Sequence, residues 1–500
     1  MSRKTSPVLY LIIFLALVLR LAGIQHGFPF IFHPDEPTIV RSALGVRFDA
    51  NPKHFDWPHL FIYANFFVYK GFAKVRDLAA DYNMQNLFIK MFPLMWDDRL
   101  VFYYITRVFA ALLGGLTVVP IYKTGKTLFG EKVGLLSALA FALIPFHVWH
   151  SHYSLPDAPM LFLMAWGVYF AARILVFGYA LDYALSGFFI GLAASTKYNG
   201  GLGAIVVPLA AFLRWATAKM KLTDFREDFP YFRAFLNLLL SAICAVTGFV
   251  LGTPYSVLDF KTFTRTDGPQ GALWQFKNVG SIPFREHFGK FFTDISFKIS
   301  DDLGYTILVA LFLTCGLIFV RFLKKTFSKY DLSLLFLIVP AFTLIYYISG
   351  FEKSRSQYYF ITYPFVSIVF GYFCVWVTHK MRFAKKIFSI PLVLILFCPL
   401  LYMSVFNSIR FLRNDTRIDL FKFLQTEVPI GTKVVYLSSD AEDVVRYVFT
   451  DAVKSADVLP KGTRYYLIEL NKGVSSGKAI FEVSNKGRIG PYITVEERIK

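Results

Sequence analysis

Residues 31–47 read IFHPDEPTIVRSALGVR and place two adjacent carboxylates, Asp35 and Glu36, just after a long apolar stretch that begins at residue 7. The pair therefore stands where a membrane-crossing helix leaves the bilayer. Charge at that depth is costly, so acidic side chains there mark either a hydrated loop or a working site. Taken alone, the pair fits a hydrated loop somewhat better, and the rest of the chain decides between the two.

The composition is that of a membrane protein. Of the 500 residues, 55% are hydrophobic and 18% are aromatic, which exceeds what an ordinary soluble domain buries. The net charge of +19 would suggest nucleic acid in a soluble protein. In a multi-span chain, however, Lys and Arg gather in the cytoplasmic loops. We therefore expect a lipid bilayer as partner and no nucleic acid. The four cysteines all lie inside apolar stretches without CxxC spacing, so they indicate neither disulfides nor a metal site.

Apolar stretches long enough to cross a bilayer, about 20 residues each, recur along the first four fifths of the chain. They predict a polytopic all-α membrane protein with about eleven transmembrane helices. Residues 183–216 fit either one broken element or two. The expected spans are 7–27, 101–121, 132–149, 157–177, 183–197, 200–216, 233–251, 303–322, 331–350, 357–378 and 386–406.

The orientation follows from the positive charges. The N-terminal MSRKTSP is basic, and the even-numbered loops are rich in Lys and Arg, which places the N-terminus and these loops in the cytoplasm. Loops 28–100 and 252–302 then face outward from the cytoplasmic membrane. Residues 59–75 are apolar but are interrupted by Lys70, so we expect an interfacial helix there. If they formed a span, the acidic pair would face the other side.

The chain changes character near residue 407. Short strand-like stretches replace the long apolar ones, and turn sequences such as NKG separate them. We expect a transmembrane module over residues 1–406 and a small extracytoplasmic soluble α/β domain over residues 407–500. The elements expected in this domain are a helix near 416–427 and strands at 433–437, 464–470 and 479–483.

Four polar clusters should meet at one membrane face if this topology holds. Each has an ordinary structural interpretation: Lys197 can reach from a helix end to the interface, and Asp157 can cap a helix. Together they suit a reaction in which a carboxylate accepts a proton from an attacking hydroxyl while cations stabilise a departing phosphate. The clusters are His33, Asp35 and Glu36; His150, His152, Tyr153 and Asp157; Lys197, Tyr198 and Asn199; Lys353, Arg355 and Tyr358.

Several motifs resemble one family when taken in order. They are FHPDE, WPHLFIY, YSLPDAPMLFL, GLAASTKYNG and RSQYYFITYP. They resemble the C-type (GT-C) membrane glycosyltransferases, and within them the family 39-like prokaryotic relatives of the dolichyl-phosphate-mannose protein mannosyltransferases and of the lipid A aminoarabinose transferase. The resemblance covers about residues 7–410 and extends to the outward tail.

The resemblance implies an inverting glycosyltransferase at the outer face of the cytoplasmic membrane. Its donor would be a sugar on a polyprenyl phosphate, and its acceptor would be a hydroxyl of a protein, a lipid or a glycan. Asp35 would be the general base, with Glu36 supporting it, and Lys197 and Arg355 would hold the donor phosphate. The full set of substrate-binding residues that it implies is His33, Asp157, Lys197, Tyr198, Arg355 and Tyr358.

A metal and three other functions stay open at this stage. His150, His152 and Asp157 offer nitrogen and oxygen ligands for a divalent ion, although no cofactor is certain. A secondary transporter is disfavoured because the ionisable residues lie at span ends and no internal repeat is visible. A membrane scaffold with a binding tail, and an oligosaccharide transferase or ligase of the same fold, remain as alternatives.

Overall fold

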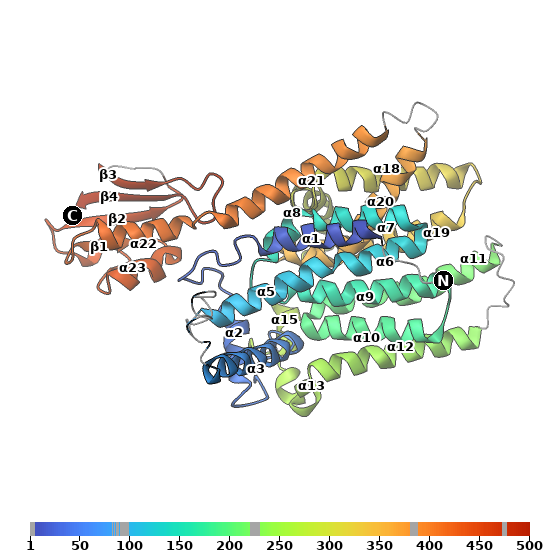
Figure 1. The fold of residues 1–500 in the computed structure, drawn as a ribbon, viewed down its shortest axis with the longest axis horizontal. Coiled ribbons are helices and arrows are strands. Elements are labelled where there is room, and N and C mark those ends of the chain that lie inside the picture. The colour runs from blue at the N-terminus through green and yellow to red at the C-terminus, as the bar shows by residue number, and fades with distance from the viewer. Residues whose placement is uncertain are drawn as a thin grey trace.

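The computed structural model is a helical bundle with a small four-stranded sheet beyond one end of it (Figure 1). It describes residues 6–82, 84, 86, 90, 100–220, 231–380, 389–472 and 478–500. The helices of the bundle are α1 (Pro7–Leu21), α5 (Val101–Leu116), α6 (Val118–Phe129), α7 (Glu131–Ala142), α8 (Pro145–His150), α9 (Asp157–Val176), α10 (Ala180–Thr196), α11 (Val206–Lys219), α12 (Tyr231–Gly252), α18 (Tyr305–Leu323), α19 (Lys329–Ser349), α20 (Tyr363–Lys380) and α21 (Ser389–Leu412).

The bundle confirms the predicted polytopic helical fold, but not the predicted count of spans. Among the described residues, eight helical segments are long and apolar enough to cross a membrane, and α1 and α10 are shorter apolar helices. The span expected at 132–149 is divided because Ile144 is extended and Pro145 starts α8. Proline disfavours a helical conformation in the residue before it.

The stretch 183–216 forms two elements. Helix α10 ends at Thr196, Lys197 is extended with φ −154° and ψ 131°, and a 3₁₀ segment, η2 (Tyr198–Ile205), leads into α11. The extended residue therefore separates the two helices at the same end of the bundle at which α9 begins.

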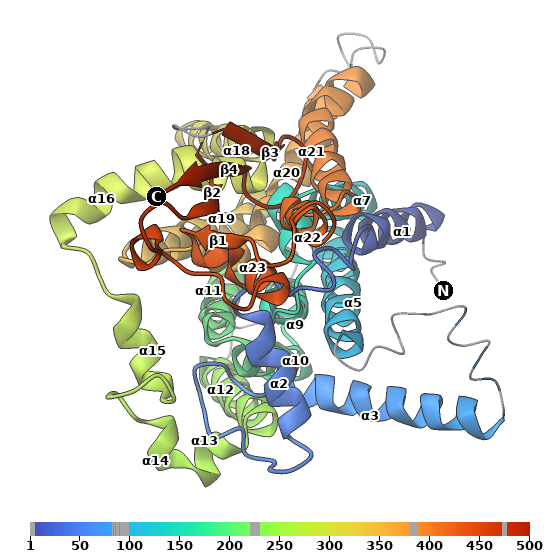
Figure 2. The same cartoon turned by 90° about the vertical axis from the view of Figure 1, so that its left-hand side faces the viewer.

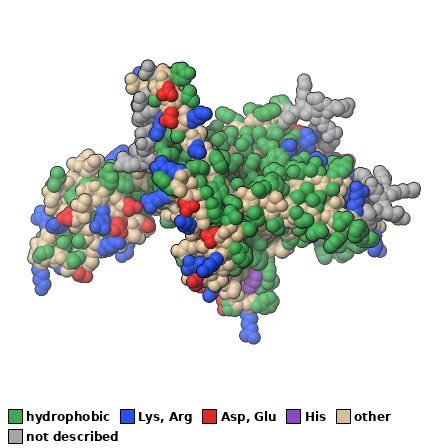
Figure 3. All heavy atoms as spheres, turned by 90° about the horizontal axis from the view of Figure 1, so that it is seen from below, with side chains coloured by type: hydrophobic (Ala, Val, Ile, Leu, Met, Phe, Trp, Pro, Cys, Tyr) green, Lys and Arg blue, Asp and Glu red, His purple; other side chains and the backbone are tan. Residues whose placement is uncertain are grey.

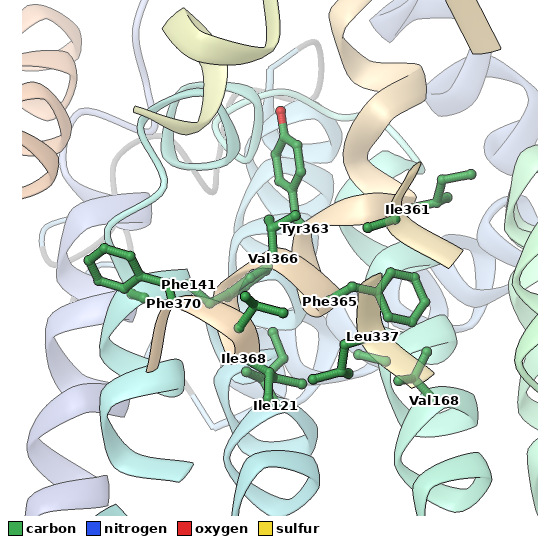
Figure 4. Close-up of a cluster of buried hydrophobic side chains, with 14 of the residues drawn as sticks. Ile121, Phe141, Val168, Leu337, Ile361, Tyr363, Phe365, Val366, Ile368 and Phe370 are labelled. Carbon is green, nitrogen blue, oxygen red and sulfur yellow. The ribbon is translucent and has the colours of Figure 1, made fainter. Parts of the chain in front are cut away.

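Helix α20 forms the centre of the apolar core. It is apolar on every side, as expected of a helix surrounded by others, and its residues 363–371 are all buried. Figure 4 shows the side chains that meet there from α6, α7, α9, α19 and α20. They include Ile121, Phe141, Val168, Leu337, Phe365, Val366, Ile368 and Phe370. The outer surface of the bundle is also largely apolar, whereas charged side chains are frequent on the sheet unit (Figure 3).

Helices α10 and α12 pack closely through glycines. A Cβ atom on Gly191 would lie 2.0 Å from the carbonyl oxygen of Ala245, and one on Gly187 would lie 2.0 Å from that of Ser241. No side chain fits into such a gap, so this contact requires glycine. Small residues four apart are a common means of close helix association in membranes.

Two loops on the sheet side of the bundle contain short helices. Helix α2 (Glu36–Gly45) begins at the second residue of the acidic pair, and α3 (Leu60–Asp81) projects sideways from the bundle (Figure 2). As expected, α3 is not among the eight candidate spans. Most of residues 83–99 lie outside the described residues. The second loop contains α13 (Tyr255–Leu258), α14 (Phe260–Phe263), α15 (Ala272–Val279), α16 (Phe284–Thr293), the π-helical turn η3 (Asp294–Ile299) and α17 (Ser300–Leu303).

The C-terminal unit is a mixed sheet covered by two helices, and it confirms the predicted small α/β unit. The strand order is β1-β2-β4-β3, with β1 parallel to β2 and the other pairs antiparallel. Strand β4 and helix α23 were not predicted. The division at residue 406 stays a prediction, and α21 continues to Leu412. The elements are α22 (Thr416–Thr426), β1 (Lys433–Tyr436), α23 (Glu442–Val448), β2 (Arg464–Leu470), β3 (Lys478–Val483) and β4 (Ile493–Ile499).

A residue from the far end of the chain belongs to the core of this unit. Phe30, from the loop after α1, is buried against the apolar side chains of α22, α23 and the sheet. Its ring lies 5.2 Å from that of Phe421 and 5.5 Å from that of Tyr447. Nearby, the Arg417 guanidinium lies 3.6 Å from the centre of the Phe32 ring. The C-terminal unit is thus attached to the segment that precedes the acidic pair.

Replacing Gly191 by alanine should destabilise the bundle, because the added carbon would collide with the backbone of α12. Overpacking of this kind costs about 1–3 kcal/mol, so thermal unfolding in detergent should occur several degrees lower. Gly316→Ala is the matched control, since no heavy atom lies within 4 Å of the added carbon. Equal melting temperatures for the two variants would contradict the close packing of α10 on α12.

Candidate functional site

A cavity of about 450 Å³ opens at the end of the bundle that faces the sheet. Its wall combines the loop after α1, the segment before α3, the start of α9, the residues after α10, helix α15, and the region from the end of α19 to the 3₁₀ turn η4 (Ser356–Thr362). A volume of this size is typical of small-molecule sites. Six of the predicted site residues line it: Asp35, Asp157, Lys197, Tyr198, Arg355 and Tyr358.

Asp157 is a buried carboxylate in the wall of this cavity. It is the first residue of α9, where the helix dipole favours negative charge. Lys197 Nζ donates to its Oδ1 at 2.5 Å, and His150 Nε2 lies 3.3 Å from its Oδ2. The side chain of Asp157 is only 1% exposed, so its charge depends on these two neighbours.

Lys197 is enclosed by aromatic rings as well as by the carboxylate. Its Nζ lies 5.3 Å from the centre of the Trp57 ring and 5.6 Å from that of Tyr358. Both distances suit a cation–π contact. The Tyr198 hydroxyl donates to the carbonyl oxygen of Phe55 at 2.8 Å and so ties the end of α10 to the segment before α3.

Asp35 and Arg355 differ from these residues because their charges are not neutralised. Within the described part of the chain, neither side chain forms a hydrogen bond or an ion pair, and both line the cavity. The backbone N–H of Asp35 donates to His33 Nδ1 at 3.2 Å, which fixes the turn before α2. The cavity thus offers one carboxylate and one guanidinium that are ready to interact with a ligand, and its lining also includes Lys353, whose Nζ donates to the Asn278 amide oxygen at 3.1 Å.

Glu36 lies beside Asp35 in sequence but does not line the cavity. It is fully buried and receives two hydrogen bonds from Arg107 of α5, at 2.7 and 2.8 Å, and one from the Ser154 backbone N–H at 2.8 Å. Arg107 also donates to the carbonyl oxygens of Ile24 and His26. Burial alone would raise the pKa of Glu36, but the Arg107 charge and hydrogen bonds hold it below its usual value. Glu36 therefore anchors the loop, and its predicted support of Asp35 in a reaction stays a prediction.

His33 lies to one side of the cavity. Its ring is 4.8 Å from that of Tyr153, and both belong to a small adjoining hollow of about 90 Å³ beside Arg107. Burial lowers the pKa of His33, so the neutral ring that accepts from Asp35 N–H is favoured. His33 belongs to the loop that carries Asp35 but does not line the cavity, and its role in substrate binding stays a prediction.

The three predicted metal ligands do not form a group. Among the described residues there is no cluster of three or more His, Cys, Asp or Glu side chains suited to a metal ion. His150 and Asp157 are neighbours, whereas the ring nitrogens of His152 face the carbonyl oxygens of Val148 and Ala22, at 2.8 and 3.0 Å. His152 also stacks on Phe411. The described residues thus place two of the predicted ligands, His150 and Asp157, side by side and the third, His152, apart from them.

Some residues of the site had no role assigned from the sequence, although Asn199 belongs to one of the four predicted polar clusters. Asn199 lines the cavity, and neither atom of its buried amide has a hydrogen-bond partner among the described residues. Gln275 and Asn278 of α15 add further amides. Arg107 had a visible signal in the sequence, as a lone cation within the apolar stretch VFYYITRVFAALLGG. A buried polar residue of this kind usually has a specific partner.

Comparison with known proteins identifies the fold. ArnT from Cupriavidus metallidurans, in a crystal structure with undecaprenyl phosphate, matches over 97% of both chains with a TM-score of 0.51 at 11% identity. The apo oligosaccharyltransferase of Archaeoglobus fulgidus matches 90% of this chain and 65% of its own, with a TM-score of 0.50 at 12% identity. The chain has the GT-C fold. At such low identity the likeness concerns the GT-C fold alone.

Sequence comparison finds a family match over part of the chain. Residues 103–246 match the family model described as dolichyl-phosphate-mannose-protein mannosyltransferase. The Saccharomyces cerevisiae dolichyl-phosphate-mannose–protein mannosyltransferase 1 is 30% identical over 140 residues, which are 27% of this chain and 16% of the yeast protein. The match thus spans about a sixth of that relative. The family-model match, over residues 103–246, includes Asp157 and Lys197, whereas Asp35 and Arg355 lie outside it.

Replacing Arg107 by alanine should destabilise the protein strongly, because it leaves the Glu36 carboxylate buried without its cation. Breaking a buried pair in this way costs about 3–5 kcal/mol, measurable by thermal or denaturant unfolding in detergent. Since folding lowers the pKa of Glu36, the contribution of the pair is full at neutral pH and is lost as the pH falls through that lowered value.

The control for this variant is Lys53→Ala. Lys53 forms an exposed ion pair with Asp49 on the loop that also carries Glu36, and 73% of the Lys53 side chain is accessible to solvent. Exposed pairs contribute little, so its unfolding should match that of the original protein. An Arg107→Ala protein as stable as this control would rule out the anchoring role of the pair.

Proposed function

We propose that the protein is an inverting glycosyltransferase that moves a sugar from a polyprenyl phosphate to a hydroxyl acceptor. The observation that carries the proposal is the pair of unneutralised groups in one cavity, the Asp35 carboxylate and the Arg355 guanidinium. They lie at the end of the helical bundle, where the phosphate of a membrane lipid is found while its tail stays among the apolar helix surfaces. The GT-C fold and the match of residues 103–246 to a mannosyltransferase family support the same reaction.

The donor phosphate would bind on the cationic side of the cavity. Arg355 would contact it directly through its planar fork, which suits phosphate. Lys197 is already bonded to Asp157 and faces the same space, so it would add positive charge there. These cations would stabilise the negative charge that grows on the phosphate as it leaves.

The transfer itself requires one proton acceptor. The acceptor hydroxyl attacks the anomeric carbon from the face opposite the phosphate, the new C–O bond forms, and the bond to the phosphate oxygen breaks with its electron pair. Asp35 takes the hydroxyl proton as general base. The phosphate is a good leaving group once its charge is countered, so a strong general acid is not required, and the anomeric configuration inverts.

The sugar would be held by amides and aromatic rings. Asn199 has a complete set of unused donors and acceptors within the cavity wall, and Gln275 and Asn278 lie on α15 across the same space. Amide groups of this kind suit sugar hydroxyls, which both donate and accept. Trp57 and Tyr358 line the cavity as well and would pack against the ring of the sugar.

We place this cavity at the outer face of the cytoplasmic membrane, with the N-terminus in the cytoplasm. The basic residues of the loops at the opposite end support this orientation through the positive-inside rule. The division into a transmembrane module and an extracytoplasmic α/β domain is part of the same proposal. His150 and Asp157 would supply two ligands to a divalent ion only if the substrates supplied the others.

A second candidate is the transfer of a whole oligosaccharide. The fold likeness to the Archaeoglobus fulgidus oligosaccharyltransferase favours it, and the two functions differ in the donor. The mannosyltransferase match favours the single sugar. A transporter has no support from the described residues, since the unneutralised charges lie at the end of the bundle.

Asp35→Asn should abolish transfer while the fold is retained. The amide has nearly the same shape but cannot accept the proton, and loss of a general base typically slows a reaction by about 10²- to 10⁴-fold. The measurement is sugar consumption from a labelled polyprenyl-phosphate sugar panel, with lipid-linked oligosaccharides included, by protein in bilayers. Cell extract supplies acceptors and divalent metal.

The control is Asp267→Asn, an exposed carboxylate of the second loop whose change should leave activity intact. Full activity of Asp35→Asn would remove this residue from the mechanism. If the original protein consumes no donor in the panel, the transferase proposal itself fails.

Arg355→Ala should weaken donor binding more than acceptor use. A hydrogen bond to a charged group contributes about 1.5–3 kcal/mol, so the donor dissociation constant should rise about tenfold or more, with the KM for the acceptor nearly unchanged. Lys261→Ala removes an exposed cation outside the cavity and serves as control. Equal losses of donor binding and of acceptor use would contradict the assignment of Arg355 to the donor phosphate. Lys197→Ala is less informative, because it also leaves Asp157 without its cation.

A further inference from the structure

A second large cavity, of about 620 Å³, lies at the other end of the same helices. Helix α9 begins at Asp157 in the candidate site and ends at Val176 in this cavity, and its 20 residues span about 30 Å. Helix α19 runs the other way, with Lys329 in the second cavity and Ile348 in the first. The two cavities therefore open on opposite membrane faces.

The wall of the second cavity is cationic. Arg214, Arg233 and Lys329 line it from the ends of α11, α12 and α19, and the described residues of the lining include no carboxylate. Arg214 donates to the carbonyl oxygens of Leu175 and Val176 at the end of α9. Arg233 and Lys329 have no ion pair within the described residues. Arg233 and Lys329 thus face one cavity without an ion pair in the described part of the chain.

Two buried carboxylates on the lining helices are already bound by other arginines. Asp182 of α10 is buried and paired with Arg173 at 2.6 Å. Asp331 of α19 is buried and paired with Arg321 at 2.8 Å. Both arginines lie outside the lining of the cavity. The acidic side chains of these helices therefore do not neutralise Arg233 and Lys329.

Next to the cations, the cavity borders on a surface that suits lipid. The rim carries the partly exposed aromatic side chains of Phe177, Tyr179 and Tyr330. Helix α12, which supplies Arg233, has a row of exposed apolar side chains that includes Phe235 and Leu239. Aromatic side chains are typical of the membrane interface. A ligand with a phosphate in the cavity could therefore place acyl chains along α12.

We propose that this cavity binds the phosphate of an anionic phospholipid headgroup, held by Arg233 and Lys329, with the acyl chains along α12. Basic pockets between transmembrane helices are known to take such headgroups. The cations are too far from the donor site to act on the same molecule, since the 30 Å length of α9 separates the cavities. The site is therefore a second lipid site, and it does not depend on the transferase reaction.

The test is binding of phosphatidylglycerol to the full-length protein in detergent, measured by native mass spectrometry, with phosphatidylcholine as the neutral comparison. Each basic residue near a membrane surface contributes about 1 kcal/mol to anionic lipid binding. The double variant Arg233→Ala, Lys329→Ala should therefore bind phosphatidylglycerol about 30-fold more weakly. Phosphatidylcholine binding should be weak and equal for all proteins.

The matched control is Lys324→Ala, Lys325→Ala, which removes two exposed cations near α19 but outside the lining. This control should bind phosphatidylglycerol as the original protein does. Equal binding by both double variants would overturn the proposal, because the attraction would then be general. Displacement of phosphatidylglycerol by millimolar inorganic phosphate would overturn the lipid assignment and leave a site for soluble phosphates. Melting temperatures with and without lipid show whether each variant is folded.

Discussion

The buried pair of Glu36 and Arg107 is the interaction on which the candidate site depends. It joins α5 to the loop after α1 and, through the Ser154 backbone, to the segment before α9. Asp35 and Asp157 are both within three residues of these contacts in sequence. Removing two charges from water is expensive, and the hydrogen bonds that Arg107 also gives to Ile24 and His26 offset that cost. The Glu36–Arg107 pair therefore fixes the positions of two acidic residues, Asp35 and Asp157.

The site divides into groups that are satisfied by the protein and groups that are left for a ligand. Asp157 and Lys197 neutralise each other, and Tyr198 is bonded to the backbone. Asp35 and Arg355 stand in the same cavity without protein partners among the described residues. The satisfied groups fix the shape of the cavity before any substrate arrives. Such preorganisation is what makes electrostatic stabilisation effective, because no reorganisation is needed during the reaction.

Six of the residues predicted from the sequence line one cavity, and the fixed length of membrane helices explains why they could be grouped. An apolar stretch of about 20 residues carries the chain from one face to the other, so Asp157, Lys197 and Arg355 had to end on the same face. The contact between Glu36 and Arg107 could not be predicted, because no local sequence pattern links residues that are 71 positions apart. Strand β4 was missed for a different reason. It lies inside the sheet with Thr494 and Glu496 buried, which hides the apolar pattern of a strand.

The place of Phe30 in the core of the C-terminal unit bears on how the protein is made. The loop that carries Asp35 leaves the ribosome early, but the side chains that enclose Phe30, such as Ile418 and Phe421, come almost 400 residues later. At typical rates of synthesis, about 5–20 residues per second, this interval is roughly 20–80 s. During this interval the helices of the bundle can assemble, while the Phe30 side chain still lacks the apolar residues that enclose it. The C-terminal unit can therefore enclose Phe30 only after every residue of the cavity has been made, and a chain truncated before α22 would keep the Glu36–Arg107 pair but lack the core that encloses Phe30.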